Sequence, residues 1–171
     1  LWTSPISFVA SANCGLYCGA SVDFVDVDPD TALMSVNALE SKLEQAKQQG
    51  KLPKIVIPVH LAGQSCDMKA ISKLGEKYNF RIIEDAAHAI GASYLNKNVG
   101  SCQYSDITVF SFHPVKVITT GEGGAALTNN LEVAKKMQLL RSHGITRDSK
   151  EMTNSIVSDW YYEQISLGFN Y

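Results

Sequence analysis

The sequence predicts an α/β protein in which a mainly parallel central sheet lies between two layers of helices. Short apolar, β-branched runs alternate with segments whose apolar residues recur about every 3.6 positions. This alternation implies crossover connections, so neighbouring strands pair in parallel and helices cover both faces. With 171 residues, 45% of them hydrophobic, the chain has enough material for the core of one domain.

The first half of the chain contains two helices among strand-like runs. Ser35 and Asp67 are favoured N-cap residues, and apolar residues at helical spacing follow each of them. Gly50 is expected to end the first helix, and Pro58 must lie at a strand end or a bulge. The predicted strands occupy residues 6–10, 22–27 and 55–59.

The second half continues the alternation and then changes character. Asn130 is expected to cap a helix over 131–143 that Gly144 closes. Residues 146–158 are polar and predict an exposed excursion, after which the aromatic cluster 160–162 needs burial or a partner surface. The other predicted elements are strands at 81–85, 107–112 and 125–127, and a hairpin over 92–99 that turns at 96–98.

Composition excludes several functional classes. The chain carries 15 Lys and Arg against 17 Asp and Glu, a net charge of -2, so it lacks the basic excess of a nucleic-acid-binding protein. It has no run of 18 apolar residues that would span a membrane. Its four cysteines lack C-x-x-C spacing, which favours free thiols in a reducing cytoplasm. His60, Cys66, His88 and Cys102 match no standard metal-ligand spacing.

The chain begins at Leu1 rather than at a methionine, and no basic segment precedes an apolar one as in a signal peptide. We interpret the chain as a piece of a longer protein. No repeat, low-complexity tract or linker precedes about residue 145. We therefore expect one structural unit over 1–145 and a different segment over 146–171.

One segment with reactive side chains follows the strand predicted at 81–85. Ligands of an open α/β sheet bind beyond the carboxyl ends of its strands. Asp85 ends an apolar strand and precedes small residues, so we expect a partly buried carboxylate that needs a cationic or hydrogen-bonding partner. Asp85 could instead cap a helix, and His88 could be a structural histidine.

The other two segments follow the strand predicted at 107–112. Pro114 forces the chain out of that strand, so Lys116 lies in a loop just beyond it. This lysine is either a solvated surface charge or an amine near an apolar wall that forms a Schiff base. The glycine-rich run 119–124 either makes tight turns or lets backbone N–H groups approach an anion, and it is neither a P-loop nor G-x-G-x-x-G.

Taken together, a buried carboxylate, a loop lysine and a glycine-rich turn at one sheet edge suit a particular cofactor. Pyridoxal 5'-phosphate has a basic ring nitrogen, an aldehyde and a phosphate, and these three groups match the three features. Asp85 would keep the ring nitrogen protonated, while Lys116 would hold the aldehyde and later shuttle a proton.

A set of ordered motifs covers essentially the whole chain. Through these motifs the chain resembles the DegT/DnrJ/StrS sugar aminotransferases, which are fold-type I pyridoxal phosphate enzymes. The residues around Lys116 look most like the branch that makes the 4-amino sugar on the pseudaminic acid pathway. The motifs are FVASAN at 8–13, DVD at 26–28, IPVHLAG at 57–63, EDAAHA at 84–89, FSFHPVKVITTGEGG at 110–124, LLRSHG at 139–144 and GFNY at 168–171.

The resemblance implies a role for six residues. Lys116 matches the Schiff-base lysine and Asp85 the partner of the pyridine nitrogen. His88 matches a position beside the phenolic oxygen, and Phe8 the aromatic residue stacked on the ring. Ser111 matches a hydroxyl on the phosphate. Asn170 matches an asparagine that reaches the phosphate site of the neighbouring subunit in a homodimer with a shared active site.

The resemblance also implies a reaction and an incomplete domain. We expect an amino group to move from L-glutamate to the 4-keto carbon of a nucleotide-linked 6-deoxy sugar, with Lys116 as general acid and base. Family members that dehydrate sugars carry histidine in place of this lysine. A sugar dehydratase and a non-catalytic regulatory relative are the alternatives. The piece would be the central part of the large domain, in a cytoplasmic enzyme, lacking a phosphate-binding turn and a small C-terminal domain and poorly active alone.

Overall fold

The computed structural model of this chain describes residues 1–153, 158 and 160–170. It forms two compact units, Leu1–Asn129 and Asn130–Tyr171, and each is described by itself. The predicted boundary near residue 145 stays a prediction. The part of the predicted excursion at 154–157 and the last residue of the GFNY motif lie outside the described residues.

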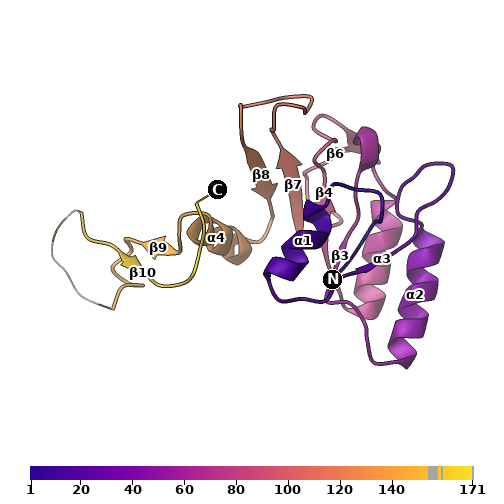
Figure 1. Cartoon of the computed structure of the whole chain (residues 1–171), viewed down its shortest axis with the longest axis horizontal. Helices are drawn as coiled ribbons and strands as arrows, with labels where there is room; N and C mark the ends of the chain where they lie inside the picture. The colour runs from indigo at the N-terminus through magenta and orange to yellow at the C-terminus, as the bar shows by residue number, and fades with distance from the viewer. Residues whose placement is uncertain (154–157, 159, 171) are drawn as a thin grey trace. The chain divides into compact units, whose positions relative to one another are not determined.

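The first unit contains a six-stranded, mainly parallel sheet (Figure 1). All neighbouring strands pair in parallel except the last two, which are antiparallel. The mainly parallel sheet of the predicted fold class is therefore confirmed. Along the sheet the strands are β2 (Asp23–Phe24), β1 (Trp2–Thr3), β3 (Ile55–Ile57), β4 (Arg81–Asp85), β7 (Ile107–Ser111) and β8 (Gly124–Leu127).

Two of the helices begin at the residues predicted to cap them. The Ser35 hydroxyl accepts a hydrogen bond from the backbone N–H of Ala38 at 3.2 Å, at the start of α2 (Val36–Gln48). Asp67 accepts one from Ala70 at 3.1 Å, at the start of α3 (Met68–Tyr78). In Figure 1 the two helices lie side by side, and they pack on one another.

The main core forms where α2 and α3 pack on the sheet. Leu39, Leu43 and Ile71 are 0% exposed, as is Val56 of β3. Full burial of each such side chain stabilises the fold by about 1.5–3 kcal/mol. The sheet below these helices is therefore a rigid base for the residues at its carboxyl edge.

Two local predictions are wrong. Residues 6–10 are not a strand: the backbone bends at residues 5–7, and α1 (Ala10–Tyr17), in which Ala10 and Ala12 are strong helix formers, begins at residue 10. The hairpin of β5 (Ser93–Tyr94) and β6 (Lys97–Asn98) turns at residues 95–96, because Leu95 and Asn96 adopt φ of 46° and 61°, the signs of a type I′ turn.

The second unit begins with α4 (Leu131–Leu140), which Asn130 caps as predicted by accepting from the N–H groups of residues 132 and 133. The helix ends three residues before the predicted end. The strands β9 (Ile145–Thr146) and β10 (Glu163–Gln164) pair antiparallel. Trp160 stacks edge-to-face on Tyr161 but remains 73% exposed.

Candidate functional site

The carboxyl edge of the sheet brings Asp85 and Ser111 to the same face. In the parallel pair of β4 and β7, Asp85 lies opposite Val109, and Ser111 follows two residues later. Alternate residues of a strand share a face, so all three project to one side. Val109 remains 38% exposed although β7 has a neighbouring strand on each side. The exposed, apolar side chain of Val109 therefore lies between the Asp85 carboxylate and the Ser111 hydroxyl.

Asp85 is held by two hydrogen-bond donors. The Ser11 hydroxyl, on α1, donates to Oδ2, and the backbone N–H of Ala87 donates to Oδ1 at 3.1 Å. Turns rather than a helix follow Asp85, so the alternative role as a helix cap is wrong. Sequence reasoning missed Ser11, because nothing in the spacing of residues 11 and 85 indicates that they meet.

Phe8 is linked to this edge through Ser11, and His88 is linked to the loop after β3 by its side chain. The carbonyl of Phe8 accepts from the N–H of Ser11 at 3.2 Å, and the residue is 76% exposed. His88 is exposed, and its Nδ1 accepts from the N–H of Ala62 at 3.2 Å. Gly63 has a φ of +89°, and a Cβ there would lie 3.0 Å from the carbonyl oxygen of His88. The loop after β3 therefore packs closely against His88, beside the carboxyl end of β4.

Lys116 lies in the loop that joins β7 to β8. Its backbone N–H donates to the carbonyl of His113 at 2.9 Å. Within the part of the chain that the structure describes, its side chain is half-buried and makes no ion pair or hydrogen bond, including none to Asp85. Lys116 therefore leaves the sheet at the strand end next to Asp85, with an amine available to a ligand.

The glycine-rich run acts as a tight turn in this structure. Gly121 has a φ of 81°. A Cβ on Gly123 would lie 2.3 Å from the hydroxyl oxygen of Thr120, so only glycine fits. The N–H of Phe112 donates to the carbonyl of Gly123 at 2.8 Å, which fixes both ends of the loop that carries Lys116.

Asn170 belongs to the second unit. It forms an isolated antiparallel bridge with Ser142, and the N–H of the preceding Phe169 donates to the carbonyl of Leu140 at 2.7 Å. The segment thus packs against the end of α4. That Asn170 reaches a neighbouring subunit stays a prediction.

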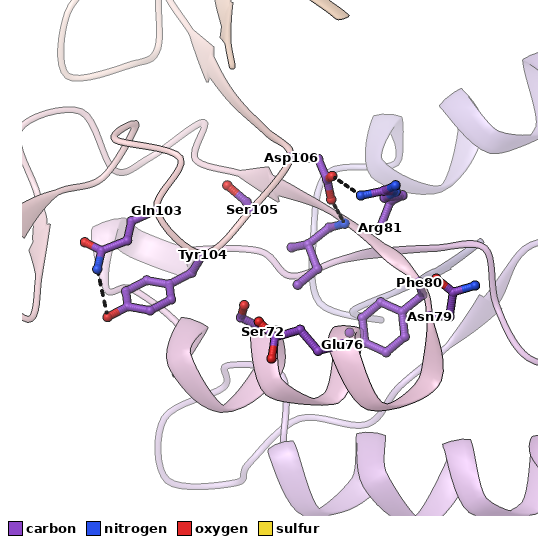
Figure 2. Close-up of a pocket in the computed structure, with 11 residues that line it drawn as sticks. Ser72, Glu76, Asn79, Phe80, Arg81, Gln103, Tyr104, Ser105 and Asp106 are labelled. Carbon is purple, nitrogen blue, oxygen red and sulfur yellow. Dashed lines mark hydrogen bonds and ion pairs between the residues drawn. The ribbon is translucent and has the colours of Figure 1, made fainter. Parts of the chain in front are cut away.

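A pocket of about 280 Å³ lies at the opposite edge of the sheet (Figure 2). Arg81 and Asp106, at the amino ends of β4 and β7, form an ion pair there at 3.0 Å. Asp106 also accepts from the N–H of Ile82 at 2.8 Å. These polar groups satisfy one another, so they do not require a ligand. Because the pocket lies at the amino ends of the strands, it is away from Asp85 and Ser111 at their carboxyl ends.

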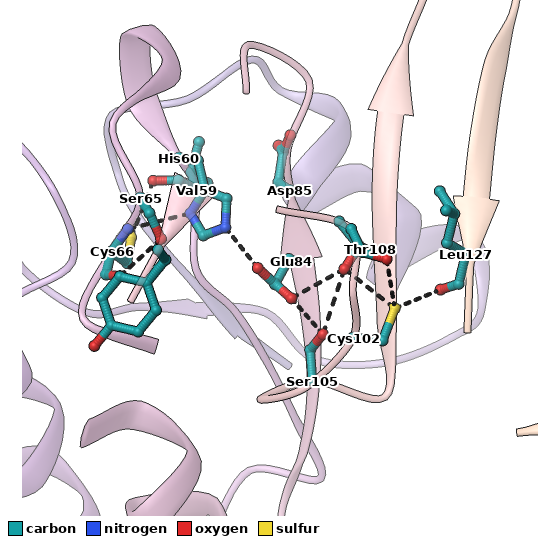
Figure 3. A network of polar contacts seen from close by, with 12 residues as sticks. Val59, His60, Ser65, Cys66, Glu84, Asp85, Cys102, Ser105, Thr108 and Leu127 are labelled. Carbon is teal, nitrogen blue, oxygen red and sulfur yellow. Dashed lines mark hydrogen bonds and ion pairs between the residues drawn. The ribbon is translucent and has the colours of Figure 1, made fainter. Parts of the chain in front are cut away.

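A buried polar network lies next to Asp85 (Figure 3). Glu84 accepts from His60 at 2.7 Å, from Thr108 at 2.9 Å and from Ser105. Burial alone would raise the pKa of Glu84, but these hydrogen bonds outweigh it and hold the pKa below its ordinary value. Sequence reasoning treated His60 only as a possible metal ligand and missed the network.

The described residues offer no metal site, and the buried thiol of Cys66 is unreactive. No three His, Cys, Asp or Glu side chains among them are grouped to hold a metal ion. Burial raises the pKa of the Cys66 thiol to about 12, so this thiol is protonated. No helix in the described part of the chain has the length and apolar character needed to cross a bilayer.

Known proteins resemble this chain over its whole length. Residues 1–171 match the DegT/DnrJ/EryC1/StrS aminotransferase family. The UDP-4-amino-4,6-dideoxy-N-acetyl-beta-L-altrosamine transaminase of Campylobacter jejuni is 43% identical over 99% of this chain. GDP-perosamine synthase of Caulobacter vibrioides is 40% identical over 97% of it. The chain spans only 41% and 40% of the lengths of these two relatives.

Solved structures of aminotransferases in this family resemble this chain in fold as well. PseC of Helicobacter pylori, an aminotransferase of pseudaminic acid biosynthesis, superposes with a TM-score of 0.83 at 35% identity, over 99% of this chain and 41% of that one. Spr1654 of Streptococcus pneumoniae, in its PLP-form, superposes with a TM-score of 0.76 at 28% identity, over 98% of this chain and 43% of that one. The predicted fold-type I class is confirmed, and the chain belongs to the DegT/DnrJ/EryC1/StrS aminotransferase family.

Proposed function

We propose that this chain is the central part of the cofactor-binding domain of a nucleotide-sugar aminotransferase that uses pyridoxal 5'-phosphate. One observation carries the proposal: the register of β4 and β7 puts Asp85, Val109 and Ser111 on one open face at the carboxyl edge of the sheet. Membership of the aminotransferase family and the PLP-form of Spr1654 support the choice of cofactor.

The residues at this edge fit the cofactor's chemical groups. Asp85 has two oxygens with acceptor capacity beyond Ser11 and Ala87, so it can also accept from a protonated ring nitrogen. Val109 offers an apolar surface to the ring, and the exposed ring of Phe8 is available to stack on it.

Two more groups complete the proposed site. The half-buried hydroxyl of Ser111 is a donor for the phosphate. His88 is proposed to lie beside the phenolic oxygen; its Nδ1 is already used by Ala62, which leaves Nε2 as a donor.

Lys116 is the proposed catalytic residue. When bound, pyridoxal phosphate supplies an aldehyde that takes up amino groups and a ring that accepts electrons. The Nζ of Lys116 would hold the aldehyde carbon at rest. Once an amino donor replaces it, Nζ would take and return the proton at the carbon that carries the amino group. Its lack of a salt-bridge partner among the described residues supports this assignment.

The substrates are proposed from the names of the relatives, and the oligomeric state from exposed apolar residues. The name of the Campylobacter relative contains a UDP-linked 4-amino-4,6-dideoxy sugar, and that of the Caulobacter relative contains a GDP-linked sugar. On this basis we propose that the acceptor is a nucleotide-linked 6-deoxy sugar with a 4-keto group and that L-glutamate is the donor. Val115, Val117 and Ile118 are 79%, 78% and 54% exposed around Lys116. Such a patch next to a site needs a cover, which a second copy of the protein would supply in a homodimer.

Absorption spectroscopy of the whole protein loaded with pyridoxal phosphate tests the proposal. We expect a visible band that Lys116→Ala abolishes and that the surface control Lys51→Ala leaves intact. L-glutamate alone should bleach the band, because the first half of a transamination needs no sugar. An unchanged band in Lys116→Ala would refute the lysine assignment. A band that resists glutamate would favour a dehydratase or a regulatory relative.

A further inference from the structure

Glu84 is a buried carboxylate that the proposed reaction does not use. It is 5% exposed and directly precedes Asp85 in β4. Its Oε2 accepts from His60, and its Oε1 accepts from the hydroxyls of Ser105 and Thr108. Figure 3 shows how these donors surround the Glu84 carboxylate.

The network around Glu84 keeps a net negative charge. The backbone N–H of Cys66 donates to Nδ1 of His60 at 3.3 Å, so the imidazole carries its proton on Nε2 and is neutral. Ser105 and Thr108 are also neutral. Within the part of the chain that the structure describes, no lysine or arginine pairs with Glu84.

The hydrogen bonds around Glu84 do not by themselves require a charged side chain. A glutamine at this position could accept from His60 through its carbonyl and donate its amide to the two hydroxyls, which rotate to accept. A buried charge is costly unless a charge of opposite sign compensates it. The hydrogen bonds offset the burial of Glu84, and the negative charge that remains would favour a cation bound nearby.

The position of the proposed cofactor supplies that cation. Glu84 shares a face with Ile82, whose Cδ1 lies 3.3 Å from the Cβ position of Gly75 in α3, whereas Asp85 faces α1. The two carboxylates thus lie back to back across one strand. Two hydrogen bonds of 2.9 Å, from His60 N–H to the Asp85 carbonyl and from Asp85 N–H to the Pro58 carbonyl, fix the strand end between them.

We propose that the buried charge of Glu84 acts through space on the ring nitrogen bound by Asp85 and raises the affinity of the site for the protonated ring. Glu84 is a supporting residue that does not touch the cofactor. The inference rests on the proposed function. For unit charges roughly 10 Å apart at an effective dielectric constant of about 20, the expected effect on a dissociation constant is on the order of tenfold.

A comparison of two ligands tests this inference. The whole protein, freed of cofactor, is titrated with pyridoxal phosphate and with its 1-deaza analogue, in which carbon replaces the ring nitrogen. We expect Glu84→Gln to weaken pyridoxal phosphate about tenfold and to leave the analogue unchanged. Glu84→Asp, which keeps the charge, should retain most of the preference for pyridoxal phosphate. Glu40→Gln, a change in a half-exposed surface carboxylate, is the matched control.

Each outcome of this comparison supports or overturns the proposed effect of the Glu84 charge. Equal weakening of both ligands would show a purely structural role, and unchanged affinities would show that the charge has no effect; either overturns the inference. If Glu84→Gln does not fold, the double variant His60→Leu with Glu84→Met replaces the network by apolar side chains and should show the same selective loss. If Asp85→Asn does not reduce the preference of the wild type for pyridoxal phosphate, the proposed site itself fails.

Discussion

The hydrogen bond between Ser11 and Asp85 gives a prediction that can be worked out from the structure. It joins α1 to the end of β4 and holds the carboxylate that the proposed site depends on. A hydrogen bond to a charged group contributes about 1.5–3 kcal/mol. Asp85 is only half-buried, so we take the lower end, about 1.5 kcal/mol.

A double-mutant cycle measures this energy. Ser11→Ala, Asp85→Ala and the double variant are unfolded with urea, and the coupling free energy is taken from the three changes. We expect about 1.5 kcal/mol. Thr31, whose hydroxyl donates to Asp28 at 3.2 Å and which shares no hydrogen-bond partner with Asp85, is the control. Its coupling to Asp85 should stay below about 0.5 kcal/mol. A Ser11–Asp85 coupling no larger than this control would refute the geometry.

Three further predictions concern stability and thiol reactivity. Hydrogen bonds lower the pKa of Glu84 in the folded state, so Glu84 stabilises the fold above its unfolded pKa of about 4.3, and this stabilisation is lost as pH falls through the folded pKa. In urea unfolding, the free energy of unfolding of Glu84→Gln should therefore fall less steeply than that of the wild type between about pH 5 and pH 3. Leu43→Ala, at a position 0% exposed, should lower the free energy of unfolding by about 3 kcal/mol, and a change under about 1 kcal/mol would contradict its place in the core. Cys66, with its pKa raised to about 12, should resist iodoacetamide at neutral pH until the protein unfolds, while exposed Cys18 reacts, as mass spectrometry of labelled peptides can check.

The fold could be predicted largely because its signals are local. Ser35, Asp67 and Asn130 cap helices whose apolar periodicity is visible in the sequence, and the helices begin where predicted. The start of α1 was missed because Ile6, Phe8 and Val9 are apolar residues typical of a strand, whereas the backbone bends at residues 5–7. The turn at Leu95 was missed because leucine rarely adopts positive φ.

The candidate site was predictable only in part. Asp85 and Ser111 end adjacent strands, and parallel pairing brings such residues to one edge. The contact of Ser11 with Asp85 depends on how α1 packs on the sheet, which no local pattern encodes. The Glu84 network joins residues from three separate segments and carries no spacing signature.

The central claim is that Lys116 holds a pyridoxal phosphate ring whose nitrogen Asp85 binds. Borohydride reduction of the loaded whole protein fixes the cofactor permanently to whichever lysine holds it, and mass spectrometry of the digest identifies that lysine. The account predicts the phosphopyridoxyl group on Lys116 in the wild type and a sharply reduced yield in Asp85→Ala. A label on any other lysine, or a full yield without the Asp85 carboxylate, would contradict it.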